Sequence, residues 1–247
     1  MLDERSEAEI AKNNIIKNYP DSRYATILTN PDLAAEKDEN SPESIYETVY
    51  ELYENQDYAK VISESDNYIN VFDGEPIVPK FELLKATAIG RLDGYEQYSK
   101  AINYIAVTYA NTEEGKQAQE IETNVLPRIA NTEFVEDENL EKHYKVIFQF
   151  DKASKEDINT FDKLLNEVLP NIKYYKLNSS VDVYDADTTF VIVHGLHNEA
   201  VAKTFDQLLT KEDKQKIKKP YFAISSNNYQ IIQIHKNLEA YLNRNTN

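Results

Sequence analysis

Tyr58-Ala-Lys-Val-Ile62 and Tyr98-Ser-Lys-Ala-Ile102 repeat one pattern 40 residues apart, and each begins a segment with helical spacing that ends in aromatic residues. An internal period of about 34–47 residues made of paired helices is typical of a helical solenoid, in which neighbouring repeats bury each other's apolar faces. A second phrase also recurs, as Asn18-Tyr-Pro-Asp-Ser22 and Thr108-Tyr-Ala-Asn-Thr112, with an aromatic residue, a turn and a capping hydroxyl. The amino-terminal part is therefore predicted to be a solenoid of stacked helical hairpins.

Turn signals divide this part into helices. Pro20 ends the first helix and Ser22 can cap the next, whereas Ser41 followed by Pro42 is typical of a helix start. The helices are expected over residues 7–17, 43–54, 57–71, 80–91, 94–109 and 113–122. The segment 7–17 resembles an interior helix, which predicts that further repeats precede it.

The hydrophobic period changes after a charged linker at residues 133–142. Alternation predicts strands at 144–150, 174–184, 188–194 and 220–225, and helical spacing predicts helices at 154–169, 198–209 and 228–242, the first capped by Ser154. The order β-α-β-β-α-β with a closing helix is the split arrangement of a ferredoxin-like sandwich. The predicted class is α+β with two domains, residues 1–132 and 143–247.

Charge divides the chain at a similar place. Residues 1–140 carry 12 Lys and Arg against 29 Asp and Glu, whereas residues 141–247 carry 15 against 14. An acidic solenoid repels phosphate backbones, so nucleic acid is a poor partner. The start, Met-Leu-Asp-Glu-Arg-Ser-Glu7, lacks a signal-peptide pattern, and the sequence has no run of about 18 apolar residues.

No pattern predicts catalysis, and we expect no catalytic residues, no cofactor and no metal. Cys is absent, which excludes thiolate chemistry, and with five Gly there is little material for a phosphate loop. His194 and His197 lack a shared face, and Asp182, Asp185 and Asp187 are typical of a hairpin turn. An enzyme would need a pocket that gathers these five residues.

The flanking residues also argue against a serine nucleophile. Ser225 and Ser226 follow a predicted strand, but the glycines of a nucleophile elbow are missing. Helix capping explains both hydroxyls.

Two groups of residues are candidate partner-binding surfaces. Tyr46, Tyr50 and Tyr53 interleave with apolar positions of the 43–54 helix and could line a peptide groove, although most of the tyrosines are expected in the solenoid core. Five lysines precede the last strand and could form a basic edge that meets the acidic repeats or a partner; they are Lys211, Lys214, Lys216, Lys218 and Lys219.

Longer phrases resemble a known family. Asn18-Tyr-Pro-Asp-Ser-Arg-Tyr-Ala25, Lys85-Ala-Thr-Ala-Ile-Gly-Arg-Leu92 and, most specifically, Lys219-Pro-Tyr-Phe-Ala-Ile-Ser-Ser-Asn-Asn-Tyr229 are similar to the carboxy-terminal part of the SprE/PorW lipoproteins. These are tetratricopeptide-repeat (TPR) proteins of gliding motility and type IX secretion in Bacteroidota. The lipid-bearing Cys of such proteins is missing here, as in a fragment without its amino terminus, and the repeats lack the consensus Trp.

The resemblance implies a scaffold without catalytic residues. Such a protein lies on the periplasmic face of the outer membrane and links the secretion translocon to the envelope-spanning energising machinery, so its partners are other subunits. Its only link to the membrane is the lipid anchor. The alternative function is peptidoglycan binding, as in sporulation-related repeats, through exposed Tyr144, Phe148 and Tyr221 on the sheet.

Overall fold

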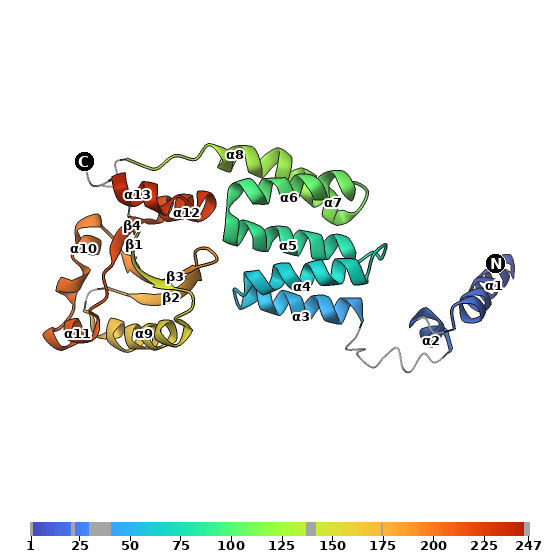
Figure 1. Ribbon diagram of the computed structural model, residues 1–247, viewed down its shortest axis with the longest axis horizontal. Coiled ribbons are helices and arrows are strands. Elements are labelled where there is room, and N and C mark those ends of the chain that lie inside the picture. Colours follow the sequence, from blue (N-terminus) through green and yellow to red (C-terminus); the bar gives the residue numbers. More distant parts are fainter. Residues whose placement is uncertain (1, 21–22, 30–40, 137–141, 174, 245–247) are drawn as a thin grey trace. The chain divides into compact units, whose positions relative to one another are not determined.

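The computed structural model describes residues 2–20, 23–29, 41–136, 142–173 and 175–244 (Figure 1). It combines helices with a four-stranded antiparallel sheet. The chain forms two compact units, Met1–Val49 and Tyr50–Asn247. This division falls within α3 (Pro42–Glu54), whereas the linker predicted at 133–142 separates helices from strands inside the second unit.

The first unit contains α1 (Leu2–Asn18), α2 (Arg23–Thr29) and the beginning of α3. The ladder of α1 ends with the N–H of Tyr19, which donates to the Ile15 C=O at 2.9 Å just before Pro20. Ser41 Oγ accepts from the Ser44 N–H at 3.1 Å, so the predicted cap of α3 is confirmed. Ser22 lies outside the described residues.

The predicted helices of the second unit are confirmed, with boundaries that differ by a few residues. They are α4 (Tyr58–Val71), α5 (Val78–Asp93), α6 (Tyr95–Thr108) and α7 (Glu113–Glu120). A further helix, α8 (Leu126–Ala130), was not predicted. Short connections make α4, α5 and α6 antiparallel neighbours (Figure 1). The first copy of the repeated five-residue pattern begins α4, and the second lies in the first half of α6, three residues after its start. Phe81, Ile102 and Ile105 are buried in the core.

Local sequence features explain the structure of the segment that follows α6. Thr112 Oγ1 accepts from the Gly115 N–H at 3.0 Å and caps α7, as predicted from the recurring phrase. A π-helical turn over Ile121–Val125 joins α7 to α8. Pro127, the second residue of α8, has no N–H to continue an α-helical ladder, which explains the wider turn just before it.

The sheet has the strand order β2-β3-β1-β4. Its strands are β1 (Tyr144–Asp151), β2 (Asn178–Val183), β3 (Thr188–Leu196) and β4 (Phe222–Ser225). Tyr144 lies opposite Leu196 of β3 and Ser225 of β4. An extra residue in β3 makes a bulge at Gly195, whose φ of 91° and close approach to the Lys176 carbonyl exclude a side chain.

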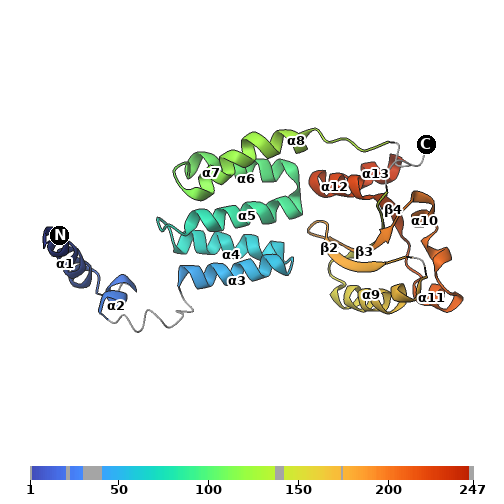
Figure 2. The same cartoon turned by 180° about the vertical axis from the view of Figure 1, so that it is seen from behind.

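Helices cover both faces of this sheet (Figure 2). On one face, Val146 and Phe148 pack with Leu165 of α9 (Lys155–Val168) and with Ala202 of α10 (Glu199–Lys203). On the other face, Ile147 and Ile192 pack with residues of α12 (Ser226–His235) and α13 (Leu238–Arg244). Alternation along β1 and β3 therefore supplies two cores, one on each side of the sheet.

Four expectations for this part were wrong in detail. Strand β2 is shorter than 174–184, and the helix predicted at 198–209 ends at Lys203 and continues as a 3-10 turn over Phe205–Leu208. The lysine-rich connection contains a short helix, α11 (Lys211–Lys216). Ser154 makes no side-chain capping bond to α9.

The helix predicted at 228–242 is two helices. Lys236 adopts a left-handed conformation with φ 53°, which ends α12, and α13 then begins at Leu238. The apolar period continues across the break because Ile232, Leu238 and Tyr241 all pack on the same face of the sheet. Periodicity alone therefore could not reveal the turn.

Gln56 joins the helical hairpins to the sheet. It lies in the α3–α4 turn with φ 58°, and its side-chain amide donates to the Val181 C=O and accepts from the Val183 N–H, both at 2.9 Å. Both groups belong to β2, an edge strand. One side chain thus makes the pair of bonds that a neighbouring strand would make.

Asp182, which follows Val181 on β2, forms the second link. Its Oδ1 accepts from Arg91 of α5 at 2.8 Å, and its Oδ2 accepts from the Tyr229 hydroxyl and from Gln233 Nε2 of α12. Burial raises the pKa of Tyr229, and the neighbouring Asp182 carboxylate raises it further, so the phenol stays a donor. One carboxylate therefore fixes a strand, a repeat helix and a closing helix.

The connection between α5 and α6 passes close to the end of α12. Gly94 has φ 79°, and a Cβ there would lie 2.7 Å from the Ile234 carbonyl oxygen. Only glycine permits this approach.

We expect Gln56→Ala to lower the free energy of unfolding by about 1–3 kcal/mol, because it leaves a C=O and an N–H of β2 without their partners. Gln56→Gly should cost less, since glycine adopts the positive φ without steric strain. Urea unfolding followed by circular dichroism measures both. The exposed Gln230→Ala is the matched control, and a Gln56→Ala variant as stable as wild type would contradict the assignment.

Asp182→Asn should lower the free energy of unfolding by about 1–3 kcal/mol, because it leaves the half-buried Arg91 guanidinium without its counter-charge. Adding Arg91→Met to that variant should recover part of the loss. A double-mutant cycle in urea measures the coupling. Strictly additive effects of the two substitutions would show that the ion pair contributes nothing.

Candidate partner-binding site

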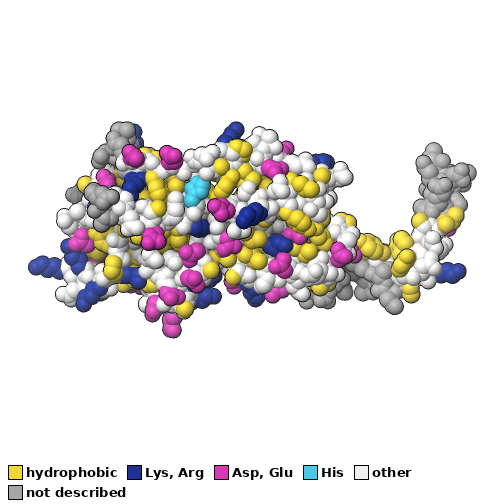
Figure 3. Space-filling model, turned by 45° about the horizontal axis from the view of Figure 1, so that its top comes forward, with side chains coloured by type: hydrophobic (Ala, Val, Ile, Leu, Met, Phe, Trp, Pro, Cys, Tyr) yellow, Lys and Arg dark blue, Asp and Glu magenta, His cyan; other side chains and the backbone are white. Residues whose placement is uncertain are grey.

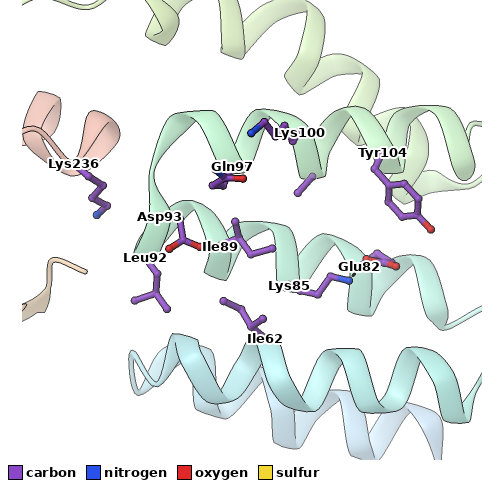
Figure 4. Close-up of a pocket in the computed structure, with 11 residues that line it drawn as sticks. Ile62, Glu82, Lys85, Ile89, Leu92, Asp93, Gln97, Lys100, Tyr104 and Lys236 are labelled. Atoms are coloured by element: carbon purple, nitrogen blue, oxygen red, sulfur yellow. Dashed lines mark ion pairs between the residues drawn. The ribbon is translucent and has the colours of Figure 1, made fainter. Parts of the chain in front are cut away.

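An open groove of about 880 Å³ runs along α4, α5 and α6 (Figure 4). Its floor is apolar, with Ile62 from α4, Ile89 and Leu92 from α5, and Ala101 from α6. The aromatic ring of Tyr104 stands at one end, and that side chain is 50% exposed. The residues of α5 and α6 that line the groove recur at helical spacing, so each helix presents one face to it.

Paired charges occupy the end of the groove near Tyr104. Glu82 is 5% exposed, and its carboxylate lies 2.7 Å from Lys85 Nζ, which also lies 3.0 Å from Asp66 of α4. Burial opposes the charge of Lys85, but the hydrogen bonds to Glu82 and Asp66 outweigh it and raise the pKa of this lysine. The ammonium group therefore stays charged and links α4 to α5.

The other end of the groove is formed partly by the sheet-bearing part of the unit. Lys236, the residue after α12, lines the groove together with Asp93, Gln97 and Lys100 (Figure 4). Its Nζ donates to the Tyr184 C=O and to Gln233 Oε1. Burial, with the nearby Arg91 cation, lowers the pKa of Lys236 to about 8.

The lining of the groove is suited to holding a peptide segment. An apolar floor with polar groups along its rim matches the surfaces on which proteins hold peptide segments. Figure 3 shows acidic, basic and apolar side chains mixed on one face of the molecule.

The three tyrosines predicted to line a peptide groove lie elsewhere. Tyr50 is 43% exposed and its ring stacks on the half-buried Tyr53, with 6.1 Å between ring centroids, while Tyr53 in turn meets the buried Tyr58. Tyr46 is half-buried in the first unit. None of the three lines the groove on α4–α6. Whether they bind a partner stays a prediction.

Two of the five lysines form ion pairs with acidic residues of the same segment. Lys214 pairs with Asp206 at 3.2 Å, and Lys216 pairs with Glu212 at 3.1 Å. Lys219 Nζ lies 3.9 Å above the ring of Phe150. Lys211 and Lys218 are exposed.

The predicted contact of this basic edge with the chain's own repeats is not seen among the described ion pairs. The described ion pair between sheet and repeats has the opposite polarity, with the cation Arg91 on a repeat helix and the anion Asp182 on the sheet. Contact of Lys214, Lys216, Lys218 or Lys219 with a partner stays a prediction.

The histidines and aspartates do not gather in one place. His194 Nε2 lies 2.7 Å from Ser180 Oγ, and its Nδ1 lies 3.1 Å from Lys145 Nζ, whereas the ring of His197 packs against His143. Burial lowers the pKa of His194, and Lys145 lowers it further. This histidine therefore belongs to a polar cluster on the sheet.

The expected turn and cap are confirmed in part, because Asp182 lies within β2 instead of the turn and Ser226 is the first residue of α12 instead of its cap. Asp185 Oδ1 accepts from the N–H groups of Asp187 and Thr188 in the β2–β3 hairpin. Ser225 Oγ accepts from the Asn228 N–H and caps α12. Among the residues that the structure describes, no group of three or more His, Cys, Asp or Glu side chains could hold a metal ion.

The aromatic residues proposed for peptidoglycan binding are mostly inaccessible. Tyr144 is 2% exposed and Phe148 is fully buried, because α9 and α10 cover that face of the sheet. The hydroxyl of Tyr221 bonds to Asp206 and to the Lys203 carbonyl. The expectation of an exposed aromatic sheet face was wrong, since the sequence did not show which face the helices cover.

Sequence reasoning missed the residues of the groove. A signal was present, because Glu82, Lys85, Ile89 and Leu92 recur at helical spacing. Charged and apolar side chains alternate along this face of the helix. The region has so many acidic residues that the pattern did not stand out in the sequence.

The chain matches no protein-family model and no curated protein. Within the described ranges, no helix has the length and apolar character needed to cross a membrane.

The free energy of unfolding should rise with pH between about 8 and 9.5, because Lys236 has a pKa of about 8 in the fold and about 10.4 in an unfolded chain. In this interval the unfolded chain binds a proton that the folded chain has released. Lys236→Met should flatten the rise and stabilise the protein below pH 8 by about 1–2 kcal/mol, after loss of the two hydrogen bonds. Urea unfolding at several pH values checks this, with the exposed Lys100→Met as control.

Proposed function

We propose that this protein is a non-catalytic scaffold that holds subunits of a bacterial envelope machine. The observation that carries the proposal is the groove on α4–α6, whose apolar floor and charged rim are open to a partner segment. The links made by Gln56 and Asp182 support the same role, since they fix the sheet and the helical hairpins to each other.

The finer fold assignment belongs to this proposal. The stacked hairpins with a 40-residue internal period favour TPR-like repeats. The strand order β2-β3-β1-β4 favours a ferredoxin-like sheet. In this assignment α12 and α13 close the face of the sheet that is turned away from α9.

The family resemblance supplies the proposed context. The phrase from Lys219 to Tyr229 covers β4 and the beginning of α12, so the most specific part of the resemblance lies where the sheet meets the closing helices. We propose the periplasmic face of the outer membrane as the location. The partners would be translocon and energising subunits of type IX secretion and gliding motility.

Photo-crosslinking tests the groove directly. A benzoylphenylalanine is placed at Tyr104 in the groove, at Tyr50 on the predicted tyrosine surface, or at the exposed Lys80 outside both, in a bacterium that carries the secretion machine. We expect a defined adduct with a secretion subunit from Tyr104 and none from Lys80. Mass spectrometry identifies the adducts.

A charge-reversal variant in the groove and a matched control outside it provide a second test. Lys100→Glu should lower recovery of the same subunit by about tenfold in an affinity purification at low salt, whereas Lys80→Glu should leave it unchanged. Adducts from Tyr50 alone would move the site to α3. Absence of adducts from all three positions would remove the support for a scaffold.

A further inference from the structure

The central strand β1 is paired unequally on its two sides. It pairs with β3 from Tyr144 to Asp151, along its whole length, but pairs with β4 only from Tyr144 to Ile147. In the described part of the chain, the half of β1 from 148 to 151 has no strand on the side of β4. An open strand edge is a template for another strand.

The main-chain groups that face this gap can be identified. Lys152 N–H donates to the Asp187 C=O beside β3, and the His143 C=O accepts from the Ser226 N–H beside β4. Because successive residues direct these groups to opposite sides, the odd-numbered residues of β1 face β4. Gln149 and Asp151 therefore point their N–H and C=O groups into the gap, where the Asp151 C=O already accepts from Ser154.

The gap has a cause in the sequence. The register that pairs Ile147 with Phe222 would place Pro220 opposite Gln149. Proline has no N–H to donate to the Gln149 C=O, so the ladder stops and β4 begins two residues later. The sheet thus ends at this point although β1 continues.

A hollow of about 600 Å³ lies at this gap. Apolar side chains line this hollow from both faces of the sheet. On one face they are Ile147 and Phe222, from the core under α12 and α13. On the opposite face they are Phe150 and Tyr221, from the other core. Leu242 of α13 adds an apolar side chain that is 40% exposed. A strand inserted here would direct alternate side chains to both groups.

The hollow also has a defined charge. Asp151 and Asp187 line its far end, both are exposed, and neither forms an ion pair within the described residues. An incoming Lys or Arg would find two carboxylates there. Lys219 also lines the hollow, with its Nζ 3.9 Å above the ring of Phe150. The gap is therefore apolar beside Ile147, and its two carboxylates outnumber the one ammonium group.

We propose that an extended peptide segment of a partner protein adds to the free half of β1 as a fifth strand. Its N–H groups supply the donor that Pro220 lacks, its apolar side chains contact Ile147, Phe222 and Leu242, and a basic side chain reaches Asp151 and Asp187. This proposal rests on the scaffold function, because it names a second surface by which a scaffold holds a partner.

The test uses the full chain and a fluorescein-labelled synthetic peptide, Arg-Val-Thr-Val-Thr-Val-Arg, with fluorescence anisotropy as the readout. Gln149→Pro removes an N–H that faces the gap without touching the bonds to β3, and Gln149→Thr changes only the side chain. We expect binding by wild type, affinity within about twofold for Gln149→Thr, and at least tenfold weaker binding by Gln149→Pro, a change of about 1.4 kcal/mol.

A second variant keeps the test decisive if Gln149→Pro fails to fold. The double substitution Asp151→Lys and Asp187→Lys changes two exposed side chains, of which Asp151 accepts a hydrogen bond from the Ala153 N–H. It should weaken binding at least tenfold while the protein stays folded, with only a small fall in the unfolding midpoint. Equal affinity of wild type and either variant would overturn the proposal, as would no binding at about 1 mM peptide.

Two further outcomes separate this proposal from others. Sedimentation velocity that shows a dimer abolished by Gln149→Pro would assign the edge to a second copy of the chain and overturn a partner segment. Secretion-subunit adducts from Tyr104 that persist in the Gln149→Pro variant, together with no peptide binding, would leave the scaffold function in place without this edge.

Discussion

The Asp182 carboxylate is the constraint on which the second unit depends. It takes hydrogen bonds from a repeat helix on one side and from the closing helix on the other, while its own strand lies at the edge of the sheet. A carboxylate with so little exposed surface requires partners, and here they come from segments far apart in sequence. The position of α12 follows from this contact, and Lys236 reaches the groove because α12 ends one residue before it.

Most elements could be predicted because their causes are local. Each signal that predicted an element involves residues only a few positions apart. These signals are the helical spacing in 57–109, the Thr112 and Ser225 caps, and the alternation of β1 and β3. The junction could not be predicted, since Arg91 and Asp182 are 91 residues apart and each has an ordinary local explanation. Arg91 looked like the basic end of a helix, and Asp182 looked like part of a turn.

The candidate site was predicted less well than the fold. Tyrosine content drew attention to α3, but an aromatic residue serves core and surface equally, and Tyr53 stacks within the hairpins. The groove instead depends on residue types that are common on any helix, such as Lys85 and Gln97. Their part in a binding surface becomes visible only when the packed helices bring them together. Likewise the sequence alternation in β1 showed that both faces are apolar without showing that both are covered.

Gln56 has a consequence for how far the sheet can grow. A sheet with two open edges can extend from molecule to molecule without limit, which is the route to fibres. Here a side-chain amide occupies the outer edge of β2, at Val181 and Val183, and no second strand is needed to satisfy those groups. A further strand could pair at Val181 and Val183 only by displacing this amide, which disfavours growth of the sheet at that edge and limits the size of any assembly joined through it.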